Sequence, residues 1–239
     1  MQTFAALQAL AELALPRSCA GCGERSCAVC PRCAGAVTLA RAIEATATWP
    51  SPTPPGFPRT WSQVPYDGPV AAMLRAFKDA GRCDLGDRLG LLLRGAIAAA
   101  LGSDEPLRDA LASGRPVLVV PVPTRAGSLR SRGRDPLAEL TRHALAGTAP
   151  ALRQVAALRA GRAGQDQAGL GADARSRNVS GSMVAARGSR LAGATVLVVD
   201  DIVTTGSTLA EAARSLHAAG AGAVSAATVA ATQRHTAPL

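Results

Sequence analysis

The chain has 239 residues, a formal net charge of +9 and a sequence pI near 10.5. This length accommodates one domain with a small module attached, and the positive charge favours partners that carry phosphates, such as nucleotides or nucleic acids. Aromatic residues make up only 3% of the chain, too few for a protein that binds single strands mainly by base stacking. No stretch is long and apolar enough to cross a bilayer, and residues 1–15 lack the basic start of a signal peptide. We therefore expect a cytoplasmic protein with no membrane partner.

Residues 4–15 are predicted to form a helix that leads into a cluster of cysteines. Cys19 and Cys22 are separated by two residues, as are Cys30 and Cys33, and seven residues lie between the two pairs. Two Cys-x2-Cys pairs present four thiolates to one tetrahedral ion, and a site filled by sulfur leaves no open position for chemistry. The spacing therefore predicts a structural Zn²⁺ site formed by these four cysteines.

Cys27 leaves the choice of ligands open, because Cys27 and Cys30 are also separated by two residues. Disulfide bonds are the main alternative to a metal, but a cytoplasmic protein keeps its thiols reduced. Redox chemistry through one Cys-x2-Cys pair is a third alternative. Such a pair normally opens a helix in a thioredoxin-like βαβ unit, and the sequence around these cysteines does not predict one.

A proline-rich stretch at residues 50–58 follows a second predicted helix at residues 34–45. Neither a helix nor a central strand forms readily in such a stretch, so we interpret residues 49–60 as a linker. Residues 1–48 would then form a helix and a four-cysteine zinc-binding module, and residues 61–239 the main domain.

The main domain begins with a turn at residues 66–69 that opens a helix ending before Gly81. Apolar residues of this helix recur on one face, and Lys78, the only lysine of the chain, lies just off it. A further helix is predicted over residues 87–101 and a buried strand over residues 116–122. An arginine-rich loop comes next, and Asp135 and Pro136 then supply the N-cap and first turn of another helix.

Residues 195–208 are the most informative segment. The apolar, β-branched stretch at residues 195–199 is typical of a strand buried on both faces of a parallel sheet. Asp200 and Asp201 follow at its carboxyl end, where open α/β sheets bind ligands. The turn at residues 204–208 opens a helix, so backbone N–H groups and hydroxyls converge on a positive helix end suited to a phosphate. An ordinary βαβ crossover shares the apolar pattern but requires neither the paired acids nor the hydroxyl-rich turn, so the segment predicts a sugar-phosphate site.

The remaining elements complete an α/β pattern. Thr208 and Glu211 have the spacing of a capping box at the start of the last helix, and residues 223–230 form the next strand. Residues 159–178 lack apolar periodicity and are expected to be a loop, after which residues 182–185 resume the sheet. Alternating strands and helices imply a parallel sheet flanked by helices.

Residues 195–208 resemble the PRPP-binding motif of the type I phosphoribosyltransferases, PRPP being 5-phosphoribosyl 1-diphosphate. With three further blocks and the cysteine pairs, they resemble the ComF family, bacterial proteins named for a role in competence. The three blocks are residues 66–78, residues 120–133 and residues 167–178, the last of which leads into the Asp-Asp motif. This resemblance implies a type I phosphoribosyltransferase-like α/β fold with a small N-terminal zinc module held by four cysteines.

The resemblance also implies roles for individual residues. Asp200 and Asp201 would be the catalytic carboxylates that hold the ribose 2′ and 3′ hydroxyls. The residues expected to wrap the 5′-phosphate are Thr204, Thr205, Gly206, Ser207 and Thr208. The other expected PRPP contacts are Lys78, Thr124, Arg125, Arg132, Arg175 and Arg177, with Arg132 on the diphosphate. A surface lysine and a solvated loop are the alternatives for Lys78 and for the arginines of residues 159–178.

The activity implied is Mg²⁺-assisted transfer of a phosphoribosyl group from PRPP to an unidentified nitrogen acceptor, linked to DNA uptake. Single-stranded DNA and DNA-uptake proteins are the partners that competence suggests. The alternatives are a non-catalytic PRPP or nucleotide-sensing adaptor and a nucleic-acid-binding competence protein. The chain departs from the family pattern in two places. After Lys78 the family usually has an aromatic or basic residue and Gly, where this chain has Asp-Ala-Gly, and after Gly133 it usually has an apolar or aromatic residue and then Asn-Gln, where this chain has Arg-Asp-Pro. The acceptor is therefore the least transferable inference.

Overall fold

The computed structural model of the protein describes residues 18–124, 133–161 and 181–232. The helix predicted at residues 4–15 lies outside this part of the chain. The helices are α2 (Pro31–Ala42), α3 (Gly68–Asp79), α4 (Gly86–Ser103), α5 (Glu105–Ala112), α7 (Pro136–Leu145) and α9 (Ser207–Ala218), with a 3-10 turn at Cys83–Leu85. The strands are β1 (Thr46–Thr48), β2 (Thr60–Pro65), β3 (Val117–Pro121), β4 (Leu152–Gln154), β5 (Leu158–Ala160), β6 (Met183–Ala185), β7 (Thr195–Val203) and β8 (Ala223–Ala231).

The main sheet has the strand order β1-β2-β8-β7-β3-β4. All neighbouring pairs are parallel except β1 with β2. In the two central pairs, Val199 of β7 lies opposite Pro121 of β3 and Ala227 of β8. The carboxyl ends of three central strands therefore meet at one end of the sheet, where the sequence predicts a ligand-binding site.

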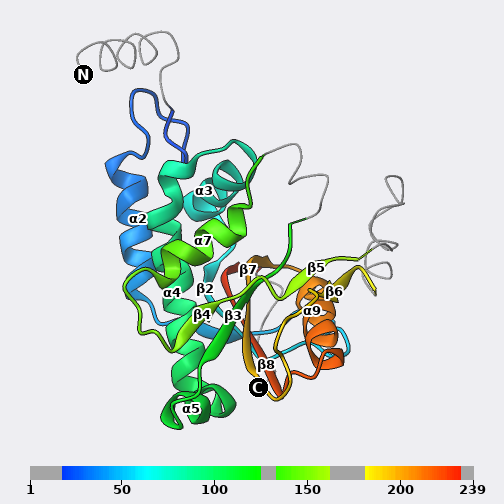
Figure 1. The fold of residues 1–239 in the computed structure, drawn as a ribbon. Helices are drawn as coiled ribbons and strands as arrows, with labels where there is room; N and C mark the ends of the chain where they lie inside the picture. The colour runs from blue at the N-terminus through cyan, green and yellow to red at the C-terminus, as the bar shows by residue number, and fades with distance from the viewer. Residues whose placement is uncertain (1–17, 125–132, 162–180, 233–239) are drawn as a thin grey trace, which may run out of the picture.

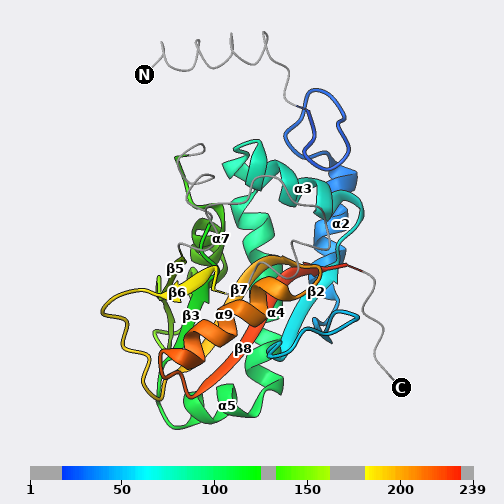
Figure 2. The same cartoon turned by 90° about the vertical axis from the view of Figure 1, so that its right-hand side faces the viewer.

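Helices cover both faces of this sheet (Figures 1 and 2). On one face α4 packs against β2, β8 and α7, and on the other α9 packs against β7 and β8. Residues 196–199 of β7 are completely buried, as the absence of polar alternation predicted. The predicted fold class, a mostly parallel α/β sheet flanked by helices, is confirmed. No helix in the described ranges is long and apolar enough to cross a membrane.

The predicted division at residues 49–60 stays a prediction, but contacts across it are extensive. Strand β1 pairs with β2 of the main sheet, and α2 packs against α3 and α4. The turn between Cys19 and Cys22 packs closely on α3, since a Cβ at Gly21 would lie 2.7 Å from Cys33 Sγ and 3.1 Å from Met73 Cε. Buried Cys19 and Cys33 belong to the same hydrophobic core as the helices of the main domain.

Two elements differ from the sequence-based expectation. Residues 182–185 were expected to resume the main sheet, but β6 instead pairs antiparallel with β5 in a separate two-stranded sheet. The strand expected at residues 195–199 continues to Val203, because its second half remains paired with β8. Asp200 and Asp201 therefore belong to the strand itself, where backbone pairing fixes their positions.

Candidate functional site

Asp200 and Asp201 lie near the carboxyl end of the central strand β7. Asp200 is 9% exposed, and Thr228 of β8 lies opposite it in the sheet. The amide of Asp201 donates to Asp200 Oδ1 at 2.8 Å, and the amide of Ile202 donates to Asp201 Oδ1 at 3.1 Å. Backbone amides thus orient both carboxylates.

The two acids have different electrostatic environments. Burial, followed by the negative charge of Asp201, raises the pKa of Asp200 well above its ordinary value. Asp201 instead forms an ion pair, because its Oδ2 accepts a hydrogen bond of 2.7 Å from Lys78 Nζ. The paired acids therefore do not present two uncompensated negative charges to an incoming anion.

Lys78 reaches this pair from the last turn of α3. Its side chain is 46% exposed, and the side chain of Asp201 is 14% exposed. Burial lowers the pKa of Lys78, but the attraction of Asp201 outweighs it and leaves the pKa above its ordinary value. The ammonium group is thus charged at neutral pH and lies beside Asp201 near the carboxyl end of β7. Its role as a PRPP contact stays a prediction.

The turn after β7 brings its hydroxyls to the start of α9. Thr204 and Thr205 are exposed, and Thr205 Oγ1 lies 3.1 Å from Ser207 Oγ. Gly206 is the N-cap of α9 and has a φ of 73°, a left-handed conformation that favours glycine. The first amides of a helix have no partner within the helix, so α9 can offer N–H donors to an anion here.

Residues of the predicted linker pack against this turn, a contact that the sequence did not predict. A Cβ at Gly206 would lie 2.7 Å from both Phe57 Cε2 and Pro50 Cγ. The segment carrying these two residues is folded, with Thr53 Oγ1 donating to Pro50 O at 2.6 Å and the amide of Phe57 donating to Pro54 O at 3.2 Å. Its prolines therefore shape a turn that packs against residues 204–208, the segment predicted to bind the 5′-phosphate.

The predicted capping box at Thr208 and Glu211 is wrong. Gly206, two residues before Thr208, is the N-cap of α9. Glu211 is buried and accepts hydrogen bonds from the amide of Met183 at 3.1 Å and from Arg214. Glu211 thus links β6 to α9 by hydrogen bonds and does not cap the amino end of α9.

The loop that follows β3 is described only at its two ends. Thr124 is half-buried, and its hydroxyl donates to Asp135 Oδ1 at 2.9 Å, while Asp135 caps α7 by accepting from the amide of Ala138. The expected N-cap at Asp135 is therefore present. The predicted PRPP contacts outside the described residues are Arg125, Arg132, Arg175 and Arg177.

Arg134, where the chain departs from the family pattern, braces α3. Its guanidinium lies 4.6 Å from the Phe77 ring centroid, donates to Phe77 O at 2.8 Å and pairs with Glu139. The hydrogen bond from Arg134 is the main cause that holds the pKa of Glu139 below its ordinary value. This contact fixes the end of α3 next to Lys78.

The four cysteines that the spacing selected lie together at the amino-terminal side of the described chain. The Sγ atoms of Cys19, Cys22, Cys30 and Cys33 all lie within 4.8 Å of one another. Cys22 Sγ and Cys30 Sγ are 3.6 Å apart, close to the ~3.8 Å edge of a tetrahedron with Zn–S bonds of ~2.3 Å. This cluster can bind a metal ion such as zinc. Cys27 lies outside it, with Sγ 3.9 Å from Glu24 O.

The thiols of the cluster have different pKa values because their surroundings differ. Burial raises the pKa of Cys19, but hydrogen bonds from the backbone amides of Cys30, Gly21 and Cys22 outweigh it and lower this pKa to about 6. Burial, together with the neighbouring thiols, raises the pKa of Cys33 instead. Four thiolates cannot gather without a compensating cation, and a divalent metal would supply that charge.

Arg82 connects this cluster to the end of α3. It donates to Ser18 O at 3.1 Å and to Ala28 O at 2.9 Å, on either side of the first cysteine pair, and it pairs with Asp84. Arg82 lies four residues after Lys78. The short segment at the end of α3 therefore contacts both candidate sites.

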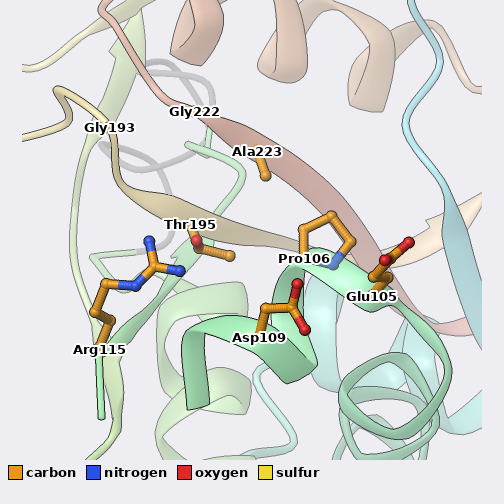
Figure 3. A pocket seen from close by; sticks show the side chains of 8 residues that line it. All are labelled: Glu105, Pro106, Asp109, Arg115, Gly193, Thr195, Gly222 and Ala223. Atoms are coloured by element: carbon orange, nitrogen blue, oxygen red, sulfur yellow. The ribbon is translucent and has the colours of Figure 1, made fainter. Parts of the chain in front are cut away.

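A hollow of about 300 Å³ opens at the other end of the central strands, beside the first residues of β7 and β8 (Figure 3). Its lining carries both signs of charge, with Glu105 and Asp109 on one side and Arg115 on the other. Ligands of open α/β sheets bind at the carboxyl ends of the strands, so this hollow lies away from the candidate sugar-phosphate site.

Comparison with known families also points to the segment that contains Asp200, Asp201 and the turn before α9. Residues 162–238 match the family model of the phosphoribosyl transferase domain. This third of the chain is similar to that domain. The matched range includes the acid pair, the turn and α9, and the parallel sheet agrees with a phosphoribosyltransferase fold. No curated protein matches the chain.

Proposed function

We propose that the protein binds PRPP at the carboxyl edge of its sheet and transfers the phosphoribosyl group to a nitrogen nucleophile. The observation that carries this proposal is the acid pair of β7 followed by a glycine-capped helix start, within the range similar to a phosphoribosyl transferase domain. Two carboxylates match the vicinal hydroxyls of ribose, and the amides of α9 match a 5′-phosphate.

In the proposed reaction, the bond from C1 of the ribose to the diphosphate oxygen breaks and its electrons leave with the diphosphate. A bond from C1 to the acceptor nitrogen forms, and that nitrogen releases a proton to solvent. Asp201 would hold a ribose hydroxyl, and the turn from Thr204 to Thr208 would fix the phosphate end. Holding both ends of the sugar orients C1 toward the acceptor.

Magnesium would enter with the substrate. Carboxylate oxygens are ligands that Mg²⁺ prefers, but Asp201 is already paired with Lys78, and burial favours the neutral form of Asp200. The acid pair therefore fits the ribose of a Mg²⁺–PRPP complex better than a protein cage for the ion. When bound, Mg²⁺ neutralises charge on the diphosphate.

The four-cysteine cluster would hold a structural Zn²⁺, because all four positions are filled by sulfur. A zinc module joined to a phosphoribosyltransferase-like domain also supports membership of the ComF family and, with it, a role in DNA uptake. Single-stranded DNA or a DNA-uptake protein would then be a partner. The positive charge of the chain supports a phosphate-bearing partner.

Calorimetry with PRPP and Mg²⁺ tests binding, and an assay of diphosphate release across nucleobases and amines tests transfer. We expect saturable binding that weakens by about tenfold or more when Asp200 and Asp201 are both replaced by Ala. Binding without diphosphate release from any acceptor would favour a PRPP sensor. No binding at millimolar PRPP, or unchanged binding by the double variant, would contradict the proposed function.

A further inference from the structure

The loop at residues 18–30 carries three of the four clustered cysteines and depends on the cluster for its order. Its residues 22–26 are exposed, so they bury little apolar surface that could hold the loop in place. The amide of Ala20 donates to Ala28 O at 3.0 Å, which closes the loop beside the thiols. Where a loop has so small a core, metal binding supplies much of the free energy that orders it. We therefore expect this loop to be ordered with a metal bound and loosened without one.

Arg82 joins this loop to α3 through both its side chain and its backbone. The guanidinium donates to Ser18 O at 3.1 Å and to Ala28 O at 2.9 Å. Asp84 accepts two hydrogen bonds from the same guanidinium, at 2.8 and 2.7 Å, which fixes its orientation. The amide of Arg82 donates to Ala76 O of α3 at 3.2 Å. A change in the order of the loop therefore reaches the end of α3 directly.

Helix α2, which carries Cys33, has an anchor that does not involve the cysteines. Gln63 of β2 is 4% exposed, and its Nε2 donates to Ala40 O at 2.9 Å and to Ile43 O at 2.6 Å. These carbonyls lie at the carboxyl end of α2, away from the cluster. Loss of the metal should therefore loosen the loop and the end of α3 while α2 stays on the sheet.

The same end of α3 contacts the candidate sugar-phosphate site. Lys78 lies four residues before Arg82, and its Nζ donates to Asp201 Oδ2 at 2.7 Å. If the end of α3 becomes mobile, Lys78 no longer holds Asp201 in one position. A ligand of Asp201 must then order this carboxylate as it binds, which lowers its affinity.

We propose that the cysteine cluster and the candidate sugar-phosphate site are coupled through α3, so that a metal at the cluster strengthens PRPP binding. This inference rests on the proposed function. Arg82 is the positioning residue of this connection, because it contacts the cysteine loop and the helix that carries Lys78. Coupling between two sites is reciprocal, so bound PRPP strengthens Zn²⁺ binding by the same factor. Oxidation of the thiols would then release the metal and lower the affinity for PRPP.

The affinity for Zn²⁺, measured by equilibrium competition with a chelator, tests the coupling in the full chain. We expect PRPP with Mg²⁺ to raise this affinity by about fivefold or more in the wild type. Free PRPP also binds Zn²⁺, which would act in the opposite direction. The double variant with Ala at Asp200 and Asp201 corrects for this effect, because it should bind little PRPP. Circular dichroism with the chelator in excess shows whether the sheet stays folded, as coupling through α3 requires.

Zinc-loaded Arg82→Gln tests the connection while the metal is still present. Calorimetry should show weaker PRPP binding than in the zinc-loaded wild type, by up to the same factor, and PRPP should raise the Zn²⁺ affinity of this variant less. Arg75→Gln is the matched control, because Arg75 is an exposed cation of the same helix that contacts Tyr66. It should retain the wild-type PRPP affinity and the full coupling.

Each contrary result identifies the step that fails. If the wild type binds PRPP but PRPP leaves its Zn²⁺ affinity unchanged, this inference fails while the proposed function stands. Full coupling in Arg82→Gln would also overturn it, as would the same effect of PRPP on the double variant or unfolding of the sheet without zinc. If the zinc-loaded wild type binds no PRPP at millimolar concentration, the proposed function fails and this inference fails with it.

Discussion

The ring of Phe57 packs against Gly206, so closely that a Cβ on Gly206 would lie 2.7 Å from Phe57 Cε2. Phe57 belongs to the turn between β1 and β2, and Gly206 caps α9 at the candidate phosphate site. Two segments about 150 residues apart in the sequence therefore determine the shape of one loop. Both the contact and the φ of 73° require glycine at this position.

We expect Gly206→Ala to weaken both the fold and the binding of PRPP. The left-handed backbone costs a non-glycine residue about 1–2 kcal/mol, and the clash with Phe57 and Pro50 adds to this cost. Thermal unfolding and PRPP calorimetry measure the two effects. Gly188→Ala is the control, because Gly188 has a φ of 80° with nothing within 4 Å of a built Cβ. Equal losses in the two variants would show that the contact with Phe57 has no effect.

The sequence predicted the elements whose pattern is local. The apolar run of β7 indicates a buried strand. The cysteine spacing selects Cys19, Cys22, Cys30 and Cys33 while leaving Cys27 as an alternative, and the structure brings the four selected cysteines within 4.8 Å. Contacts between distant segments could not be predicted in this way. Lys78 and Asp201 are 123 residues apart, and only the parallel topology places the end of α3 beside β7. Glu211 had the spacing of a capping box, but the amide of Met183 and Arg214 provide competing partners.

The packing of residues 49–60 against Gly206 could not be predicted from the sequence, and the reason lies in their prolines. Proline prevents regular hydrogen bonding within the segment, and the sequence does not reveal whether such a segment crosses solvent or packs as a turn. Here Pro50 and Phe57 lie against Gly206, and β1 and β2 on either side pair with each other. Threonine-rich strands as short as β1 carry too little apolar periodicity to be recognised.

The metal content of single cysteine variants tests the cluster. We expect one Zn²⁺ per chain in the purified reduced protein, lost on Cys→Ser replacement at Cys19, Cys22, Cys30 or Cys33. Loss of the metal should also lower the melting temperature, since cysteines of the cluster belong to the common core. Elemental analysis measures the zinc. Cys27→Ser and Cys83→Ser are the controls, and loss of zinc in Cys27→Ser with retention in Cys30→Ser would overturn the assignment.

Arg82→Gln should loosen the cysteine cluster from α3. The variant loses charged hydrogen bonds to Ser18 O and Ala28 O, which predicts a loss of about 1–3 kcal/mol in the free energy of unfolding. We also expect faster release of Zn²⁺ to a chelator. Arg88→Gln removes the same charge from an exposed position of α4 and should change neither quantity. Zinc release at the wild-type rate from Arg82→Gln would show that Arg82 does not support the cluster.

Any binding of single-stranded DNA should be mostly electrostatic, because the chain is basic and poor in aromatic residues. Each phosphate contact then loses about 2.5-fold in affinity between ~50 and ~200 mM salt. Fluorescence anisotropy with a labelled oligonucleotide measures this dependence. Heparin, a polyanion without bases, should compete for the same surface. Tight binding that hardly changes with salt would instead indicate base stacking.

Asp200→Asn should stabilise the fold while weakening PRPP binding. Burial and the charge of Asp201 raise the folded-state pKa of Asp200 above its ordinary value of 3.8. At this one group the folded protein therefore binds more protons than the unfolded chain between pH 3.8 and the folded-state pKa, and the contribution of Asp200 to stability falls as the pH rises through that range. The variant lacks this loss, yet its amide oxygen can still accept from the amide of Asp201. Its advantage in melting temperature should be present at pH 7 and disappear as the pH falls below 3.8.

Asp201→Asn is the matched comparison, because it relieves the repulsion on Asp200 but also removes the ion pair with Lys78, so its gain in stability should be smaller than that of Asp200→Asn. Thermal unfolding from about pH 3 to about pH 8 for both variants, with PRPP calorimetry at pH 7, separates the two carboxylates. A lower melting temperature for Asp200→Asn at pH 7 would contradict this account, because it would mean that the buried carboxylate stabilises the fold. Higher stability with weaker PRPP binding would show that the carboxylate of Asp200 lowers the stability of the fold but contributes to PRPP binding.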